Sequence, residues 1–391
     1  MNHAEQPGDA IAAVTHPDPY PWYAALRRGP ALARDERLGL WIASRADVVR
    51  ELLAHDALRV RPAAEPVPKA ITGTPAGELF GRLVRMNDGE PHAAHKPVLQ
   101  RALGALDIAS AREAALGVAR EMALGEAEGA TGSQLSDFCL DYPVSAVAYL
   151  LGFADAELPR LAGWMRDFVA CLSPLSSASQ LAAAGRAASA LMDRFEGIAL
   201  ARPAPHGSLL AAVQRETEDR GSRELRANLV GLLSQTCEAT AGLIGNGLVA
   251  LAREPGLRRR LDSHPELLPA LVEEVARHDP SVQNTRRFVA RTTVIEGTAL
   301  APGDAVLLVL AAANRDPALN PAPANFEPMR THRQMLGFGY GPHACTGQAL
   351  AFAIAGAGLQ SLLARGLRCE ALQERSWDYW PSVNARIPRF H

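Results

Sequence analysis

The chain has 391 residues, of which 48% are hydrophobic, and its 40 basic and 42 acidic side chains give a formal net charge of −2. This balance gives no reason to expect nucleic acid or an anionic membrane surface as the main partner. The five cysteines are odd in number, widely spaced and without a Cys-x-x-Cys pair, so neither a disulfide framework nor a zinc finger is indicated. A reducing compartment fits this cysteine usage best.

The amino-terminal segment lacks a basic start followed by an apolar run, which is the pattern of a secretory signal. No stretch approaches the roughly 18–20 uninterrupted apolar residues that a membrane span requires. We therefore expect a cytoplasmic protein with neither a membrane nor a nucleic acid as its partner.

Most long segments are rich in alanine and leucine, which favours helices, and strand signals are few. The first strand is expected at Leu40–Ile42, and residues 61–90, with their prolines and glycines, are expected to form a loop. A long helix is expected from about Glu224 to Leu251, where leucines recur at helical spacing. A second is expected from about Glu266 to His278, ending before an Asp-Pro pair.

Further strands are expected at Val294–Ile295 and Ala305–Leu310. Residues 312–335 contain four prolines and should be irregular. A third helix should begin just after Cys345 and reach about Leu363. These elements predict a mainly α fold with small β-sheets. Neither a linker nor an internal repeat divides the sequence, so residues 1–391 are expected to form one domain.

Cys345 stands in a glycine-rich segment that runs from Leu336 to Ala351. Three glycines and a proline ahead of the cysteine let the backbone turn tightly and approach a flat object closely. The positive end of the helix expected next, with its free N–H groups, favours a thiolate. A single thiolate in such a loop suits a haem iron, whose in-plane ligands come from the porphyrin.

This segment has two other interpretations. Cys345 could be a small buried hydrophobic residue, which is the commoner fate of a lone cysteine. The spacing Gly339-x-Gly341-x-x-Ala344 could also belong to a dinucleotide-binding loop. That second interpretation is disfavoured, because Tyr-Pro-His interrupts the loop, no β-branched strand precedes it, and no acidic residue follows at the expected distance.

The segment resembles the haem-binding signature of the cytochrome P-450 family, Phe-Gly-x-Gly-x-His-x-Cys-x-Gly-x-x-Leu-Ala, and matches all eight specified positions from Phe338 to Ala351. The resemblance extends over nearly the whole chain. It implies a single cytochrome P-450 domain, a triangular helical prism that encloses haem b (iron protoporphyrin IX). It also implies an oxygen-activating monooxygenase-type oxidoreductase in which Cys345 binds the iron. Phe338, His343 and Gly347 are then expected to contact the haem.

Glu274 and Arg277 lie at i,i+3 on an expected helix and could form a surface ion pair of little energetic value. They also resemble the Glu-x-x-Arg motif of the family, which braces the cysteine loop. The resemblance implies that Arg330, after a Phe-containing irregular segment, is the third member of this brace.

The resemblance further implies a set of residues for the two haem propionates, which require cationic or hydrogen-bonding partners. Four residues match family positions, with lysine in one place where the family usually has arginine, and Arg287 could substitute for one of them. The four are His92, Lys96, Arg286 and His343. A two-histidine metal site at His92 and His95 is the alternative, but no HExxH motif and no third ligand of suitable spacing supports it.

The long helix at 224–251 resembles the distal helix of the family, which usually reads Ala-Gly-x-acid-Thr. This chain has Gln235-Thr236-Cys237-Glu238-Ala239, so the acid is kept and the threonine is lost. The family's threonine hydroxyl organises proton delivery during oxygen activation, and alanine cannot donate. The substrate, ordered water, Gln235 or Thr236 could take over this role. Thr240 is adjacent but should point elsewhere, since one residue turns about 100° around a helix.

These features predict an enzyme that oxidises a small specialised metabolite, by hydroxylation or by oxidative coupling or ring formation. A bacterial member of this length is expected to be a monomer that receives electrons from NAD(P)H through a reductase and a ferredoxin or flavodoxin. Lys96, Arg101 and Arg333 are expected to form the docking surface for that partner. The alternative function is a haem-thiolate protein without turnover that acts in recruitment or sensing.

Overall fold

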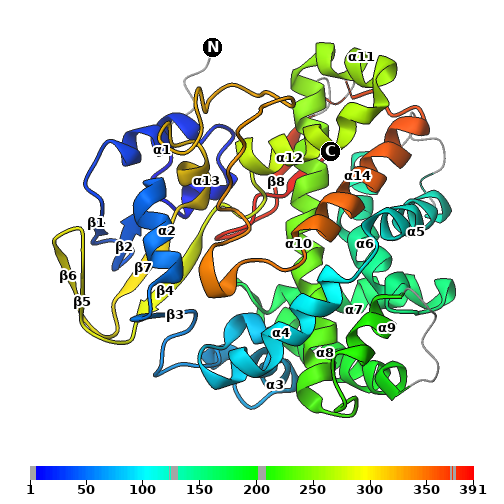
Figure 1. Cartoon of the computed structure of the whole chain (residues 1–391), viewed down its shortest axis with the longest axis horizontal. Helices are drawn as coiled ribbons and strands as arrows, with labels where there is room; N and C mark the ends of the chain where they lie inside the picture. The colour runs from blue at the N-terminus through cyan, green and yellow to red at the C-terminus, as the bar shows by residue number, and fades with distance from the viewer. Residues whose placement is uncertain (1–5, 123, 125–130, 201–207, 370–371, 373–375) are drawn as a thin grey trace. The chain divides into compact units, whose positions relative to one another are not determined.

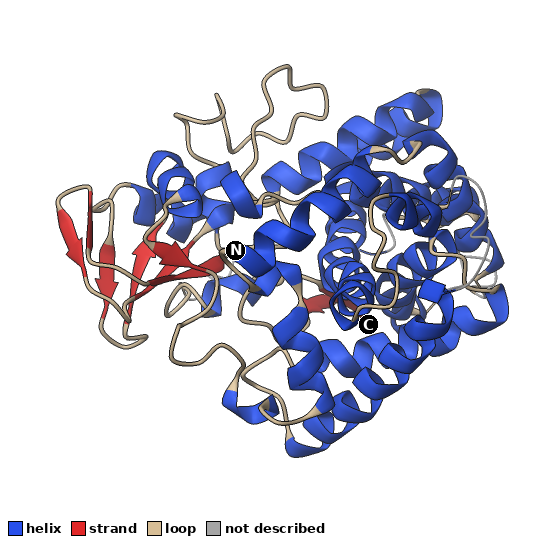
Figure 2. Cartoon of the chain, turned by 60° about the horizontal axis from the view of Figure 1, so that its bottom comes forward, coloured by secondary structure: helices blue, strands red, loops and turns tan. Residues whose placement is uncertain are grey.

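The computed structural model describes residues 6–122, 124, 131–200, 208–369, 372 and 376–391. Helices make up most of this chain, and the strands are few and short (Figure 1; Figure 2). The chain divides into two compact units. The first comprises Met1–Ala64, Gly242–Cys345 and Arg368–His391, and the second comprises Glu65–Ala241 and Thr346–Leu367. A mainly α fold with small β-sheets is thereby confirmed.

The first unit holds all the strands found in the described residues. Its main sheet has five strands in the order β1-β2-β7-β4-β3, in which β2 and β7 run parallel and the other neighbours antiparallel. Two further strand pairs, β5–β6 and β8–β9, lie outside this sheet. The strands are β1 Ala33–Asp35, β2 Leu40–Ala43, β3 Leu58–Arg59, β4 Thr285–Val289, β5 Thr293–Ile295, β6 Thr298–Leu300, β7 Ala305–Leu308, β8 Trp377–Tyr379 and β9 Pro388–Phe390.

The strands β2 and β7 lie side by side inside the main sheet because nearly every residue in them is apolar. Ile42 is paired with Leu307, and both are buried. Such continuous apolar runs are typical of strands that are covered on both faces. Leu308 joins a cluster with Leu52 of α2, and Leu307 joins a second cluster with Tyr23 of α1. The helices of this unit are α1 Tyr20–Arg27, α2 Ala46–Ala54, α11 Pro255–Ser263, α12 Leu268–His278 and α13 Leu310–Asn314.

Arg386 joins the two ends of the first unit and is fully buried. Its Nη1 donates to the carbonyl oxygens of Val14 at 3.0 Å and of His16 at 2.6 Å, and its Nη2 donates to the hydroxyl of Tyr379 at 2.7 Å. Asp279, just after α12, supplies the counter-charge, with 2.9 Å between Nε and Oδ1. A buried arginine needs such a full set of acceptors, because an unpaired buried charge is strongly destabilising.

The second unit consists of helices and the loops between them, with no strand in the part that the structure describes. Its last helix, α14, packs against α5, and Tyr142 of α6 donates a hydrogen bond of 3.0 Å to the carbonyl oxygen of Ile354 in α14. The stretch Gly341–Ala364, which includes α14, is long and apolar enough for a membrane span, but 56% of its apolar window is buried, as in a core helix. The helices are α3 Pro75–Arg82, α4 Glu90–Gly104, α5 Ile108–Glu121, α6 Gly132–Leu150, α7 Leu158–Ala170, α8 Ala178–Leu200, α9 Leu209–Arg215 and α14 Gln348–Ala364.

One continuous helix, α10 (Arg223–Arg253), belongs to both units, and their boundary falls between Ala241 and Gly242. Beyond that boundary α10 approaches its neighbours closely, because two of its residues lack side chains. A Cβ on Gly242 would lie 2.4 Å from the Cβ of Ser281. A Cβ on Gly245 would lie 2.8 Å from the Cδ of Pro388.

The expected helices at 224–251 and after Cys345 are confirmed as α10 and α14. The expectation of a loop over the whole of 61–90 is wrong, because α3 lies within it. Pro75 begins α3 rather than breaking a helix, and Thr74 caps it by accepting a hydrogen bond from the backbone N–H of Gly77. The strand expected at 305–310 ends at Leu308, since Leu310 already begins α13.

Candidate active site

The loop before Cys345 is closed by three backbone hydrogen bonds. The N–H of Cys345 donates to the carbonyl of Phe338 at 2.8 Å, that of Gly339 to Leu336 at 2.8 Å, and that of Ala344 to Gly341 at 3.0 Å. Gly339 and Gly341 have φ values of +75° and +69°, which side-chain-bearing residues rarely adopt. A Cβ on Gly341 would also lie 2.9 Å from the Cβ of Ala54. Gly339 and Gly341 of the signature are therefore required by the shape of the loop.

Two buried asparagines hold the chain as it enters this loop. Asn314 accepts a hydrogen bond from the backbone N–H of Leu336 at 2.6 Å. Asn320 donates to the carbonyl of Gln334 at 2.8 Å and accepts from its N–H at 3.0 Å. Sequence reasoning gave neither asparagine a role, because both fall within residues 312–335, which were expected to be irregular, and no spacing rule connects them to the cysteine.

Cys345 is exposed, whereas the other four cysteines are buried. Burial raises the pKa of Cys139 to about 12 and that of Cys171 to about 11, so these thiols stay protonated at neutral pH. The interpretation of Cys345 as a small buried hydrophobic residue is therefore wrong. Cys345 precedes Gly347, the N-cap of α14, so the thiol lies close to the start of this helix.

Glu274 and Arg277 form a fully buried ion pair on α12, so the surface-pair interpretation is wrong. Arg277 grips the carboxylate with two hydrogen bonds, from Nη2 to Oε1 at 2.6 Å and from Nε to Oε2 at 2.9 Å. Burial alone would raise the pKa of Glu274, but hydrogen bonds from Arg277, the backbone N–H of Glu327 and Arg333 outweigh it and hold the pKa below its usual range.

The same carboxylate also binds Arg330 and Arg333. The Nε of Arg330 lies 3.4 Å from Oε1 of Glu274, and the Nε of Arg333 lies 3.1 Å from Oε2. Arg277 and Arg330 additionally donate to backbone carbonyls of the irregular segment, including that of Asn325, at 2.9 Å and 3.2 Å. Glu274 therefore joins α12 to the irregular segment that leads into the cysteine loop.

The assignment of Arg333 to a docking surface is wrong. Its side chain is only 10% exposed. Besides Glu274, it contacts Glu273 at 2.6 Å and donates to the carbonyl of Pro328 at 2.6 Å. A positive charge with these partners belongs to the brace, and the sequence could not show this because Glu273 and Arg333 are far apart along the chain.

The four residues expected to bind the propionates fall in both units. His92 and Lys96 lie in α4 of the second unit, and both are partly buried. Arg286 is an exposed residue of β4 in the first unit, and His343 ends the short 3₁₀ helix Gly341–His343. Arg287, the possible substitute for Arg286, is 6% exposed. Its Nη1 donates to the carbonyl of Arg286 at 2.9 Å.

The expected distal residues lie in the part of α10 that belongs to the second unit. Thr236 donates its hydroxyl proton to the carbonyl of Leu232 at 2.7 Å, and the side-chain amide of Gln235 donates to the carbonyl of Gly231 at 3.0 Å. Thr240 is buried, with 1% of its surface exposed. The hydroxyl of Thr236 is therefore committed to its own helix, as is common for threonine within helices.

Arg85 is a charged neighbour of Glu238 that sequence reasoning missed. Burial raises the pKa of Glu238, and the positive charge of Arg85 opposes this shift. Burial likewise lowers the pKa of Arg85, and the charge of Glu238 opposes it. The only signal in the sequence is an arginine among the apolar residues ahead of His92.

Comparisons with known proteins agree with this geometry. Residues 208–365 match the family model described as Cytochrome P-450. Cytochrome P-450 144 of Mycobacterium tuberculosis is 28% identical over 405 aligned residues, which cover 99% of this chain and 91% of that protein. The mycinamicin IV hydroxylase/epoxidase of Micromonospora griseorubida is 30% identical over 291 residues, covering 73% of this chain and 72% of that protein. The chain belongs to the cytochrome P-450 family.

The fold of this P-450 is shared with solved members of the family. The crystal structure of CalO2 matches it with a TM-score of 0.82 and 26% identity, covering 99% of this chain and 97% of that one. The expectation of an oxidoreductase enzyme with the cytochrome P-450 fold is thereby confirmed. The family implies a haem-iron cofactor.

The described residues of this P-450 fit that cofactor. They include no group of three or more His, Cys, Asp or Glu side chains placed to hold a metal ion. Cys345 offers one accessible thiol at the end of a loop whose shape is already fixed by its own backbone. A metal bound there needs its other ligands from elsewhere, which a porphyrin provides.

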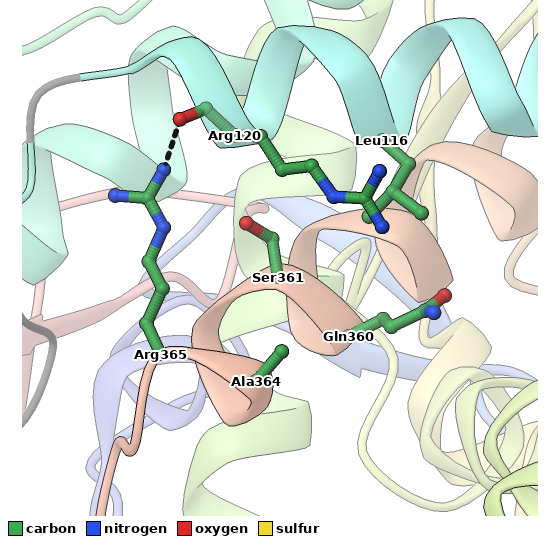
Figure 3. A pocket seen from close by; sticks show the side chains of 6 residues that line it. All are labelled: Leu116, Arg120, Gln360, Ser361, Ala364 and Arg365. Carbon is green, nitrogen blue, oxygen red and sulfur yellow. Dashed lines mark hydrogen bonds between the residues drawn. The ribbon is translucent and has the colours of Figure 1, made fainter.

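The cavity drawn in Figure 3 is a separate feature of this P-450. It measures about 220 Å³ and contains none of the candidate site residues. Arg365, on its wall, donates to the backbone carbonyls of Ala119 at 3.0 Å and Met122 at 3.1 Å, at the end of α5. These bonds satisfy carbonyls at a helix terminus, so this arginine has a structural role.

Proposed function

We propose that this P-450 holds haem b through the thiolate of Cys345 and uses O2 to oxidise a small specialised metabolite. The observation that carries the proposal is the accessible thiol in a closed loop that matches the whole haem-binding signature. The hydroxylase/epoxidase activity named for one relative supports the reaction class. When bound, the haem iron supplies the oxygen chemistry, and the protein supplies binding, orientation and protons.

The side chains proposed for the haem propionates are His92, Lys96, Arg286 and His343. Cationic and N–H groups suit these carboxylates because such hydrogen bonds are charge-assisted. Lys96 presents a point charge where arginine would offer a planar fork, so its contribution is less directional. Phe338 and Gly347, on either side of Cys345, complete the proposed haem contacts.

Electrons are proposed to come from NAD(P)H through a reductase and a ferredoxin or flavodoxin, to a monomeric enzyme. With Arg333 excluded, Lys96 and Arg101 remain as docking residues. Arg101 has a 56% exposed side chain and lies 2.5 Å from Glu216. An acidic partner would compete with Glu216 for this guanidinium, so association should weaken as salt is added.

Proton delivery is proposed to rely on Glu238 together with a hydroxyl or amide of the substrate, or with ordered water. The side chain of Ala239 has no donor, and Thr236 and Gln235 already donate to carbonyls of α10. The pKa of Glu238 is raised by its burial, which favours the protonated carboxyl that a proton donor needs. The product distinguishes the two reaction types: a gain of one oxygen means insertion, and a loss of two hydrogens means coupling or ring formation.

The test of the proposed function is a carbon monoxide difference spectrum of the reduced holoprotein. Thiolate ligation predicts a Soret band far to the red of that of a histidine-ligated haem. The Cys345→Ala variant should lose this band, and Cys171→Ala, which changes a buried cysteine, should keep it. A folded wild-type protein without the band would refute the assignment of Cys345.

The alternative of a recruiting or sensing protein without turnover rests on the unusual residues at 235–239. It predicts that ligands bind without any increase in NAD(P)H consumption in the presence of reductase and ferredoxin. The proposed enzyme predicts ligand-dependent consumption, so one kinetic measurement separates the two functions.

A further inference from the structure

The segment 82–87, which carries Arg85, is held against α10 by hydrogen bonds. The backbone N–H of Val84 donates to Oδ1 of Asn228 at 2.7 Å, and Asn228 is itself buried. On the other side of Arg85, the side-chain amide of Asn87 donates to the carbonyl of Leu83 at 2.7 Å. The backbone at Arg85 is thus fixed from both sides.

A glycine in α10 allows this segment to come close. Gly231 lies about one helical turn after Asn228, and a Cβ at this position would lie 3.0 Å from Cδ2 of Leu83. Gln235 and Glu238 follow at the next two turns of the same helix face. Asn228 and Gly231 therefore place the Arg85 segment beside the face of α10 that carries Glu238.

The guanidinium of Arg85 has donors that no described residue uses. Its Nε is buried without a hydrogen-bond partner, and among the residues the structure describes its one electrostatic partner is Glu238, with which it forms no direct ion pair. By contrast, the two Nη groups of the buried Arg386 have four oxygen acceptors. A guanidinium in a site of low polarity needs acceptors, because leaving its donors unmet is costly.

We propose that Arg85 binds a carboxylate group of the substrate. The planar fork of a guanidinium matches a carboxylate through two parallel N–H···O bonds, which sets both affinity and orientation. Because Arg85 lies beside Glu238, the carboxylate end of the substrate would be held near Glu238. This inference rests on the proposed function and names the chemical class of its substrate.

The experiment compares carboxylates with their primary amides, which have nearly the same shape and no charge. The probes are octanoate, 4-phenylbutyrate and cyclohexanepropionate, each with its amide, titrated into the holoprotein by calorimetry and by the high-spin spectral shift. At least one carboxylate should bind about ten-fold more tightly than its amide, as expected for a charge-assisted pair.

The variants Arg85→Gln and Arg85→Lys assign this preference to the guanidinium. Arg85→Gln should abolish it, and Arg85→Lys should keep part of it, since the charge remains but the fork is lost. Arg82→Gln is the matched control. Arg82 lies in the same segment but pairs with Glu224 at 3.5 Å and Glu78 at 3.8 Å, so the preference should survive its removal.

Three outcomes would overturn the proposal. The wild-type protein shows no preference for any of the carboxylates, or the preference persists in Arg85→Gln. In the third, Arg85→Gln releases haem while Arg82→Gln does not, which would assign the guanidinium to a propionate. None of these depends on the carbon monoxide spectrum of the wild-type protein, so failure of this inference is distinguishable from failure of the proposed function.

Discussion

Ala239 and its neighbours show how a single missing hydroxyl changes the chemistry available to a helix. Thr236 lies one turn earlier, but its hydroxyl donates a hydrogen bond to the carbonyl of Leu232, and Thr240 is buried. Glu238 is then the carboxylic acid of this turn. Burial raises its pKa, and the positive charge of Arg85 opposes this shift. In the proposed proton path, Glu238 is therefore the acid, and the remaining donors come from the substrate or from water.

Substitution of Ala239 tests this view directly. Ala239→Thr restores the hydroxyl, and Ala239→Val adds a side chain of nearly the same shape without it. If the substrate assists proton delivery, the two variants should behave alike, and neither should raise the fraction of electrons found in product. Product formed per NAD(P)H consumed measures this, with the ligand that gives the largest high-spin shift. A several-fold rise in Ala239→Thr alone would rule out substrate assistance.

The cysteine loop could be predicted well from the sequence, because its local geometry requires particular residues. Two glycines at positive φ and one close contact with α2 fix the spacing of the signature. The assignment of Arg333 failed for the opposite reason. Its role depends on Glu273 and Glu274, which the fold brings close from another part of the chain. Arg85 was missed on the same ground, since only tertiary packing places it beside Glu238.

The close packing of α10 can be tested by a substitution at Gly242. Gly242→Ala should destabilise the protein by about 1–3 kcal/mol, because the new Cβ would lie 2.7 Å from the backbone oxygen of Arg386, which cannot move aside cheaply. Gly117→Ala in α5 is the control, since a Cβ there meets nothing within 4 Å. It should stabilise by about 0.5–1 kcal/mol through helix propensity. Urea-unfolding midpoints of the holoproteins should move in opposite directions, and a shift of both in the same direction would contradict this packing.

At the scale of the whole molecule, buried titratable groups set how stability depends on pH. Burial, and after it the charge of Arg315, lower the pKa of His278 to about 4. Arg315 lies 2.8 Å from Nδ1 of His278, and Nε2 lies 2.9 Å from the carbonyl of Ala324, so the neutral ring suits both contacts. Burial raises the pKa of Asp141 to about 6, which has the opposite effect on stability over part of the same range.

We predict that His278 contributes acid sensitivity between about pH 6.5 and pH 4. Unfolded histidine binds its proton near pH 6.5 and the folded ring only near pH 4, so the stability is fully present above the first value and is lost as the pH falls toward the second. The loss should approach about 3 kcal/mol. The variant His278→Gln should flatten the profile of unfolding free energy against pH in this window. An unchanged slope would show that the ring binds its proton at nearly the same pH in the folded and unfolded protein.

In the first unit, the sequence predicts features that depend on neighbouring residues, and it does not predict features that depend on segments far apart in the chain. The strands at Leu40–Ile42 and Val294–Ile295 follow from local apolar patterns and are confirmed as β2 and β5. The register that pairs Ile42 with Leu307 depends on two segments far apart in the sequence, and no local pattern specifies it. Neither does any local pattern reveal the role of Arg386, whose backbone partners come from the other end of the chain.

Arg386 has a practical consequence for anyone who shortens this protein or fuses it to another. Its guanidinium is neutralised by Asp279 and bonded to the carbonyls of Val14, His16 and Pro17. Trimming the amino terminus past Pro17 would remove three backbone acceptors of the buried guanidinium, and trimming the carboxyl terminus before Arg386 would remove the ion-pair partner of Asp279. An electron-transfer domain is therefore best attached after His391, which is exposed and takes no part in the interactions of Arg386.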